Sequence, residues 1–123
     1  MTPNILIVDD DDALRLSLTK LLGAAGYTVD SRRSAKTALA AMNLKVKEWD
    51  IVVSDLRLPE MDGLEFLRQV KALQAHVQVV LMTGYASAEL EETALQMGAV
   101  ALLRKPFPIQ DLCQILESLA VKK

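Results

Sequence analysis

The feature that most restricts the fold is an alternation of short apolar runs with longer stretches of helical periodicity. In the stretches between and after the runs, apolar residues recur at spacings of three and four, as on one face of a helix. The segments of strand length lie at residues 5–8, 27–30, 51–55, 77–82 and 99–103; residues 27–30 alternate, as in a strand near the sheet edge, and the others are mainly apolar. Strands joined by helix-length crossovers form parallel sheets with helices on both faces. The sequence therefore predicts one α/β domain over residues 1–123, with a doubly wound, five-stranded parallel sheet in three αβα layers.

The expected helices begin and end at residues suited to those positions. The acids at the end of Asp9–Asp12 can cap the first helix, and Gly26 can end it. The apolar stripe of that helix comprises Leu14, Leu18, Leu21, Leu22 and Ala25. In the last helix, Cys113 falls on the apolar stripe, which predicts a buried, inert thiol.

Composition excludes several classes of function. With 51% hydrophobic and 24% charged residues, a chain of 123 residues can bury a core without disulfides or metals. A net charge of -2 argues against a nucleic-acid contact by this domain, which would need a basic face. The longest apolar runs are too short to span a membrane, and the N-terminus lacks the pattern of a secretory signal. We therefore expect a cytoplasmic domain without membrane contact.

The third apolar run, residues 51–54, leads directly into Asp55. Pro59 and Gly63 prevent the strand from continuing, so Asp55 should lie at the carboxyl end of an interior strand. Ligands of open α/β sheets bind at this edge. An aspartate that merely starts a turn would fit the same stretch, and the stretch alone does not separate the two interpretations.

Polar residues follow the other strands as well. Asp9 and Asp10 follow the first strand, Thr83 the fourth and Lys105 the fifth. A flavodoxin-like strand order 2-1-3-4-5 would place the first and third strands side by side and bring three carboxylates together. Such a cluster needs a proton or a cation to offset its repulsion. Hard oxygen ligands with room for water suit Mg²⁺, and Mn²⁺ could substitute.

These groups fit phosphoryl transfer to a carboxylate. Asp55 can act as the nucleophile and form an acyl phosphate. The reaction needs in-line positioning and neutralisation of the phosphoryl oxygens. The metal ion, the Lys105 ammonium and the Thr83 hydroxyl can each take one of those oxygens.

The chain resembles the receiver domains of two-component response regulators over nearly its whole length. It resembles chemotaxis-regulator-like receivers in general. Its motif sequences are similar to those of N-terminal receivers of DNA-binding transcriptional regulators. The matching motifs are Ile7-Val8-Asp9-Asp10, Ser54-Asp55-Leu56-Arg57-Leu58-Pro59-Glu60-Met61-Asp62-Gly63, Met82-Thr83-Gly84 and Lys105-Pro106-Phe107. The start at Met1, just before the first strand, suggests a natural N-terminus, and the end at Lys123 would suit a receiver cut from a longer regulator.

The resemblance assigns roles to the acidic residues. It implies that Asp55 is the phosphoacceptor and also a metal ligand. Asp10 would bind Mg²⁺ directly, Asp9 mainly through water, and Arg57 through its backbone carbonyl. The other acids nearby, Asp11, Asp12 and Asp62, are better explained as helix caps or turn formers.

The resemblance also implies a switch. Lys105 would contact the phosphoryl group, the bond between Lys105 and Pro106 would be cis, and the Thr83 hydroxyl would move toward the phosphoryl group. Many receivers carry an aromatic residue or histidine three positions before the lysine. Here Leu102 stands there and offers no ring to couple to the threonine, so we expect the change to be smaller or to pass through the loop at Tyr85.

Arg57 and Tyr85 each lie two residues after a site residue, where the resemblance places them beside the path of the hydrolytic water. We expect their bulk to shield the acyl phosphate.

A sensor histidine kinase or a phosphotransfer protein would supply the phosphoryl group. The face formed by the fourth helix, fifth strand and fifth helix, with Leu95 as an exposed apolar residue, would pass the signal to an output domain or a homodimer partner that controls transcription. Two other functions remain open: an interaction module that is never phosphorylated, and a phosphohydrolase with an aspartyl-phosphate intermediate. The expected protein is a switch that catalyses only its own phosphoryl transfer and slow dephosphorylation.

Overall fold

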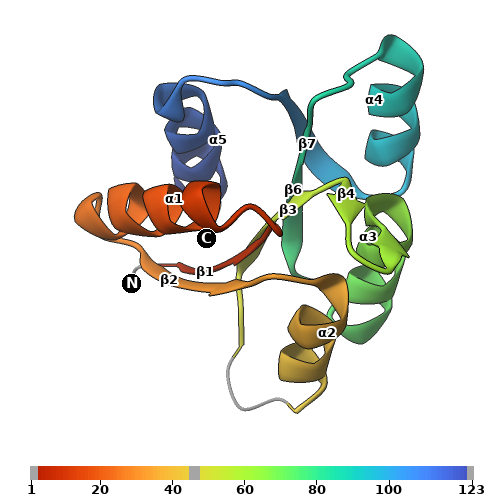
Figure 1. Cartoon of the computed structure of the whole chain (residues 1–123), viewed down its shortest axis with the longest axis horizontal. Coiled ribbons are helices and arrows are strands. Elements are labelled where there is room, and N and C mark those ends of the chain that lie inside the picture. The colour runs from red at the N-terminus through yellow and green to blue at the C-terminus, as the bar shows by residue number, and fades with distance from the viewer. Residues whose placement is uncertain (1–2, 45–47, 122–123) are drawn as a thin grey trace.

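The computed structural model describes residues 3–44 and 48–121, the side chains of 120 and 121 excepted. Its centre is a parallel sheet in the order β2-β1-β3-β6-β7 (Figure 1). The strands are β1 (Asn4–Val8), β2 (Thr28–Arg32), β3 (Ile51–Asp55), β6 (Gln78–Thr83) and β7 (Ala99–Arg104). In chain order of these strands the arrangement is 2-1-3-4-5. The predicted flavodoxin-like topology is therefore confirmed.

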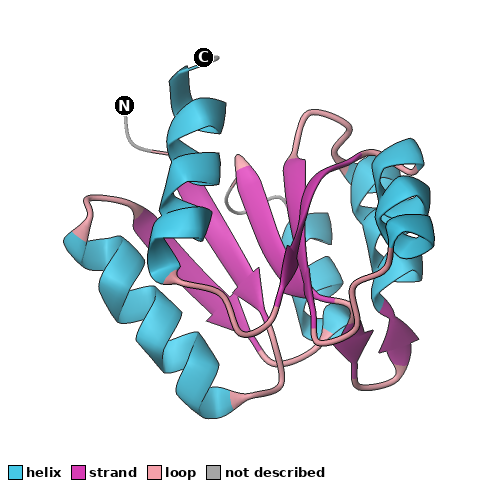
Figure 2. Ribbon diagram, turned by 90° about the horizontal axis from the view of Figure 1, so that it is seen from above, coloured by secondary structure: helices cyan, strands magenta, loops and turns pink. Residues whose placement is uncertain are grey.

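Helices cover both faces of the sheet, as the view along the layers shows (Figure 2). They are α1 (Asp12–Ala24), α2 (Ala35–Asn43), α3 (Gly63–Leu73), α4 (Ala88–Gln96) and α5 (Ile109–Val121). One apolar cluster joins the sheet to α1 and α5, and a second joins the opposite face to α2, α3 and α4. β1 and β3 are buried on both faces, which explains their unbroken apolar sequences. Within the described residues, no helix combines the length and apolar character needed to cross a membrane.

Short polar side chains start the helices. The Asp11 carboxylate accepts a hydrogen bond from the backbone N–H of Leu14, at 3.1 Å, and so caps α1. Ser34, Asp62 and Ser87 cap α2, α3 and α4 in the same way. The expectation that Asp11 and Asp62 are capping acids is thus met, and Asp12 lies in the first turn of α1.

The stretch between Asp55 and α3, where the sequence predicted only the end of a strand, contains a small hairpin. β4 (Arg57–Leu58) pairs antiparallel with β5 (Met61–Asp62). Pro59 and Glu60 form the turn, and Glu60 has φ +67°. Proline suits the first turn position and a positive φ the second, so the chain reverses where the sequence showed only an end to β3.

Three burial predictions need correction. Leu21 is 47% exposed and Ala25, the residue after α1, is exposed as well, whereas Leu18 and Leu22 are buried. Leu21 lies about 100° around the helix from Leu22, at the opposite edge of the stripe, and α1 turns the edge that carries Leu18 and Leu22 toward the sheet. Cys113 is only partly buried. Leu95 is exposed, as expected.

Candidate functional site

The ends of neighbouring strands bring the predicted site residues to one edge of the sheet. Asp9 follows β1, Asp55 ends β3, Thr83 ends β6 and Lys105 follows β7. The pairing register places Val8 beside Ser54, Asp55 beside Met82 and Thr83 beside Arg104. The parallel register therefore aligns these ends, and residues far apart in the sequence form one pocket.

Asp9 anchors the inner side of this pocket. Its side chain is fully buried, and each carboxylate oxygen accepts a hydrogen bond. Oδ1 accepts from the backbone N–H of Asp11 at 2.9 Å, and Oδ2 accepts from the Lys105 ammonium at 2.8 Å. A buried carboxylate is tolerated only when it is paired and hydrogen-bonded. Asp9 meets that condition without a metal ion.

Lys105 joins two of the carboxylates. Its Nζ also lies 3.2 Å from Asp55 Oδ2. Burial by itself would lower the pKa of Lys105, but the hydrogen bond and charge of Asp9, followed by the charge and hydrogen bond of Asp55, raise that pKa above its ordinary value. Lys105 is therefore a fixed positive charge at neutral pH, placed between the predicted phosphoacceptor and the buried acid.

Three carboxylates offer a site for a hard cation. One oxygen each from Asp9, Asp10 and Asp55 lie within 4.8 Å of one another. Asp9 already has a hydrogen bond on each oxygen, whereas Asp10 is exposed. Asp55 Oδ1 accepts from the backbone N–H of Arg57 at 3.2 Å, which ties the Arg57 backbone to this carboxylate. An all-oxygen, partly exposed donor set of this kind fits Mg²⁺.

Thr83 and Tyr85 form the side of the pocket facing α4. The Thr83 side chain is buried, and its hydroxyl oxygen accepts a hydrogen bond from the backbone N–H of Tyr85 at 3.0 Å. The Thr83 carbonyl accepts from the backbone N–H of Lys105 at 2.7 Å. The peptide bond between Lys105 and Pro106 is cis. Thr83 is thus bonded both to the strand that leads to Lys105 and to the loop that leads to α4.

Two exposed side chains, from the segments that follow β3 and β6, contact each other. The Arg57 guanidinium carbon lies 4.9 Å from the centre of the Tyr85 ring, within the range of a cation–π interaction. Tyr85 is 72% exposed. The sequence placed both residues near the site but did not predict this contact, because it joins two different loops.

Leu102 takes the position discussed for the aromatic switch residue. It is partly buried in β7 and packs against the apolar cluster beneath α2, α3 and α4. It thus fills space beside α4, and it has no polar group that could form a hydrogen bond with the Thr83 hydroxyl.

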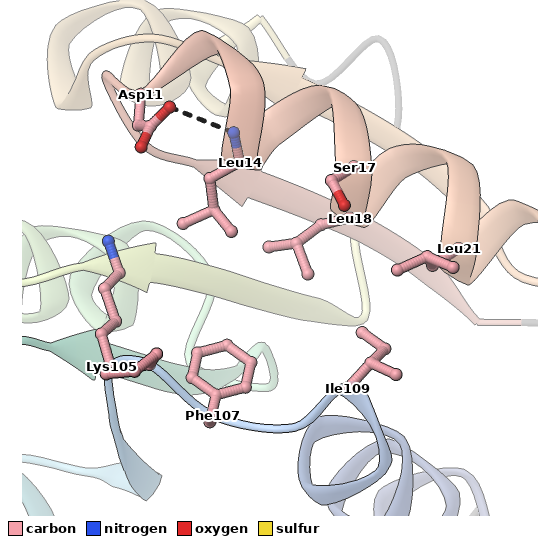
Figure 3. Close-up of a pocket in the computed structure, with 9 residues that line it drawn as sticks. Asp11, Leu14, Ser17, Leu18, Leu21, Lys105, Phe107 and Ile109 are labelled. Atoms are coloured by element: carbon pink, nitrogen blue, oxygen red, sulfur yellow. Dashed lines mark hydrogen bonds between the residues drawn. The ribbon is translucent and has the colours of Figure 1, made fainter.

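An apolar groove runs from the pocket along α1 (Figure 3). Its volume is about 460 Å³. Leu14, Leu18 and Leu21 of α1 face Phe107 and Ile109 across it, and Lys105 lies at the end nearest Asp11. The exposed Leu21 therefore lines a largely apolar groove that begins at Lys105, beside the acidic pocket.

Sequence reasoning missed Arg15. Its Nη1 donates a hydrogen bond to the Asp9 carbonyl oxygen at 2.9 Å, and its Nη2 lies 2.8 Å from Asp12 Oδ1. A signal was available, since Arg15 follows Asp12 by three residues in a predicted helix, a spacing that favours ion pairs. The contact with Asp9 depends on how the loop leaves β1 and could not be read from that spacing.

The geometry agrees with a match to a known family. The model of the response regulator receiver domain matches residues 5–117. The chain belongs to this family. The resemblance stated from the motifs is confirmed.

Relatives of receiver domains show where such chains occur. FixJ, a transcriptional regulatory protein of Bradyrhizobium diazoefficiens, is 39% identical over 115 residues, which are 94% of this chain and 55% of FixJ. DctD of Rhizobium meliloti, a C4-dicarboxylate transport transcriptional regulatory protein, is 38% identical over 91% of this chain and 24% of DctD. Sporulation initiation phosphotransferase F of Bacillus subtilis is 32% identical, over 91% of this chain and 89% of that protein. The chain thus spans about half the length of FixJ and about a quarter of the length of DctD.

Solved structures agree with the fold. A CheY-like receiver domain protein from Methanospirillum hungatei has a TM-score of 0.87 and 31% identity, with 100% of both chains covered. A receiver domain protein from Clostridium thermocellum has a TM-score of 0.89 and 27% identity, covering 98% of this chain and 95% of the other.

Proposed function

We propose that this receiver domain takes a phosphoryl group onto Asp55, with Mg²⁺, and thereby switches an output domain or partner. The observation that carries the proposal is the placement of Asp55 at 3.2 Å from the Lys105 ammonium, in a cluster with Asp9 and Asp10. A nucleophilic carboxylate, a fixed cation and an oxygen-rich metal site are the parts that phosphoryl transfer to aspartate requires.

In the proposed reaction, a carboxylate oxygen of Asp55 attacks the phosphorus of a donor phosphohistidine. The new O–P bond forms as the P–N bond breaks, and the electron pair of that bond passes to the imidazole nitrogen. Lys105 is bonded to Asp55 Oδ2 before the reaction, and it would bind a phosphoryl oxygen once the phosphoryl group is on Asp55. Asp10, Asp55 and the Arg57 carbonyl would hold Mg²⁺, with Asp9 acting through water. The ion would supply charge neutralisation at the phosphoryl oxygens, and Mn²⁺ could replace it.

The donor would be a sensor histidine kinase or a phosphotransfer protein. Any such donor must bring a phosphohistidine to Asp55 and therefore cover the surface beside it. The apolar groove between α1 and residues 106–109 begins at Lys105 and offers that surface (Figure 3). The cytoplasm, where such kinases present their phosphohistidine, is the location that we propose.

The switch would begin at Thr83. When its hydroxyl turns to a phosphoryl oxygen, it gives up the bond from the backbone N–H of Tyr85 and frees the loop before α4. Because Leu102 carries no ring, we propose that the change passes through this loop to the face formed by α4, β7 and α5. Leu95 and Val100 expose apolar surface there, and this face would bind the output domain or a second copy. Since FixJ and DctD are transcriptional regulators, the output that we propose is control of transcription.

Arg57 and Tyr85 would govern how long the phosphoryl group lasts. Both side chains are exposed and in contact, and the backbone N–H of Arg57 is bonded to the Asp55 carboxylate. A hydrolytic water that approached Asp55 from this side would have to pass them. We propose that the pair slows dephosphorylation by hindering that approach.

Phosphorylation by acetyl phosphate or a phosphohistidine protein in Mg²⁺, followed by phosphate-affinity gel electrophoresis, tests the main proposal. Wild type should be modified once, and Asp55→Asn should not be modified. Asp62→Asn is the matched control, since it changes a nearby exposed acid and keeps a capping side chain. Modification of Asp55→Asn at the wild-type rate would overturn the proposal, and an unmodified wild type would favour a non-phosphorylated interaction module. Rapid turnover of small phosphoesters would instead indicate a phosphohydrolase.

A further inference from the structure

Asp10 is the most exposed of the three clustered acids, so its position depends on its backbone. Each peptide group that flanks it is held by one hydrogen bond. On the N-terminal side, the Asp9 carbonyl accepts from Arg15 at 2.9 Å. On the C-terminal side, the Asp11 N–H donates to Asp9 Oδ1 at 2.9 Å. Two fixed peptide planes determine the direction in which the Asp10 Cβ leaves the chain.

Arg15 is itself firmly placed. Its side chain is only 17% exposed, and its two terminal nitrogens bind different acceptors: Nη1 the Asp9 carbonyl and Nη2 the Asp12 carboxylate, at 2.8 Å. The Asp12 carboxylate also lies 3.5 Å from Arg33 Nε. The rigid fork of a guanidinium can hold two acceptors at once, which the single ammonium of a lysine does less well. Arg15 therefore ties the first turn of α1 to the loop that carries Asp10.

We propose that Arg15 is a positioning residue of the Mg²⁺ site, which it serves by holding the peptide group before Asp10. The inference rests on the proposed function, because it concerns the same metal site. Arg15 is neither a ligand nor a catalytic residue, since its contacts are to the Asp9 backbone and to Asp12. Groups that orient metal ligands commonly change metal affinity by about 10- to 100-fold when they are removed.

The sign of the effect separates positioning from simple electrostatics. Arg15 places a positive charge beside the acidic cluster, and a positive charge repels Mg²⁺. If charge alone mattered, its removal would tighten Mg²⁺ binding. Positioning predicts the opposite, because an unfixed Asp10 must be ordered when the ion binds.

The experiment is a calorimetric Mg²⁺ titration of the whole chain and three variants. Arg15→Gln should weaken Mg²⁺ binding by about 10-fold. Arg33→Gln is the matched control, because it removes a positive charge near the same acidic loop without touching the Asp9 carbonyl; it should leave affinity unchanged or slightly increased. Arg15→Lys, which keeps the charge and can satisfy only one acceptor well, should fall between wild type and Arg15→Gln. Amide resonances of Asp10 and Asp11 should broaden or shift in the Arg15 variants before any Mg²⁺ is added.

The outcomes are distinct. Equal or tighter binding by Arg15→Gln overturns the inference. If thermal unfolding shows that Arg15→Gln does not fold, Arg15→Lys decides: weaker binding supports positioning and wild-type binding overturns it. Saturating Mg²⁺ should restore phosphorylation of Arg15→Gln by acetyl phosphate to within about twofold of wild type, because positioning acts on binding. Asp10→Asn is titrated in the same way to test the metal site itself. If wild type does not bind Mg²⁺, or if Asp10→Asn binds it as tightly as wild type, the proposed metal site has failed, whatever Arg15 does.

Discussion

The inner wall of the pocket, formed by Asp9, Asp55 and Lys105, differs sharply from its outer rim, formed by Asp10, Arg57 and Tyr85. In the wall, Asp9 is fully buried and Lys105 bridges two carboxylates at 2.8 and 3.2 Å. In the rim, the side chains are exposed, and Arg57 and Tyr85 meet through a single ring contact. The wall should therefore contribute mainly to stability and reactivity, and the rim to exchange of the metal ion, water and partner.

The largest effect should come from the wall. Lys105→Met should lower the free energy of unfolding by about 3 kcal/mol, because it leaves the buried Asp9 carboxylate without its cation. Phosphorylation should slow by about 100-fold through the loss of a placed charge. Urea unfolding and gel assays measure the two effects.

Two checks accompany Lys105→Met. Lys36→Met is the control, since Lys36 is exposed on α2, and it should leave both quantities nearly unchanged. Because the folded pKa of Lys105 is raised, its stabilisation is complete below the ordinary value of 10.5 and is lost only as the pH rises through the folded pKa. The difference between wild type and variant should thus persist from neutral to mildly alkaline pH. A difference that disappeared already at pH values well below the ordinary pKa would contradict the bridging role.

A smaller effect on stability is expected at Gly63, where α3 begins against the backbone of Leu56. Gly63 donates a backbone hydrogen bond to the Leu56 carbonyl at 2.8 Å, and a Cβ on Gly63 would lie 2.5 Å from Leu56 Cα. Gly63→Ala should therefore destabilise the protein by about 2 kcal/mol, since backbone must move. In Gly23→Ala the added methyl has nothing within 4 Å, and the change should stabilise α1 by about 0.5 to 1 kcal/mol. Equal thermal unfolding temperatures of Gly63→Ala and Gly23→Ala would refute the close approach of Gly63 to the Leu56 backbone.

The effect of Asp10→Asn on stability should change sign when Mg²⁺ is added. Without Mg²⁺, it relieves repulsion among carboxylates within 4.8 Å and should stabilise the protein by about 1 kcal/mol. With excess Mg²⁺, wild type gains binding free energy that the variant loses, so wild type should become the more stable. Thermal unfolding with and without Mg²⁺ measures both stability differences. Glu91→Gln, at an exposed position of α4, is the control and should show neither difference. An identical response of wild type and Asp10→Asn to Mg²⁺ would place the ion elsewhere.

The smallest effect on stability, below about 0.5 kcal/mol, should follow removal of the exposed rim residues. Arg57→Ala and Tyr85→Ala should each accelerate loss of the phosphoryl group by about threefold, which is under 1 kcal/mol in the barrier. Tyr85→Phe keeps the ring and should behave like wild type. Dephosphorylation rates unchanged in both alanine variants would exclude shielding.

Much of the fold followed from local pattern. Apolar runs such as residues 51–54, helical spacing and the capping acids Asp11 and Asp62 depend on neighbours in the sequence, and each was predicted. The alignment of Asp9, Asp55, Thr83 and Lys105 at one edge also followed, because parallel strands point the same way. The hairpin between Arg57 and Asp62 was missed because two-residue strands carry almost no periodic signal.

By itself, then, the sequence determined which residues end the strands of this receiver domain and hence which chemistry gathers at the edge of the sheet. Only the tertiary structure decided the contacts within that edge. Lys105 bonds Asp9 across 96 positions, Arg15 holds the peptide before Asp10, and Arg57 meets Tyr85. The physical reason is that strand and helix signals are local, whereas these contacts depend on strand order, on the paths of loops and on side-chain rotamers that form only when the whole sheet packs.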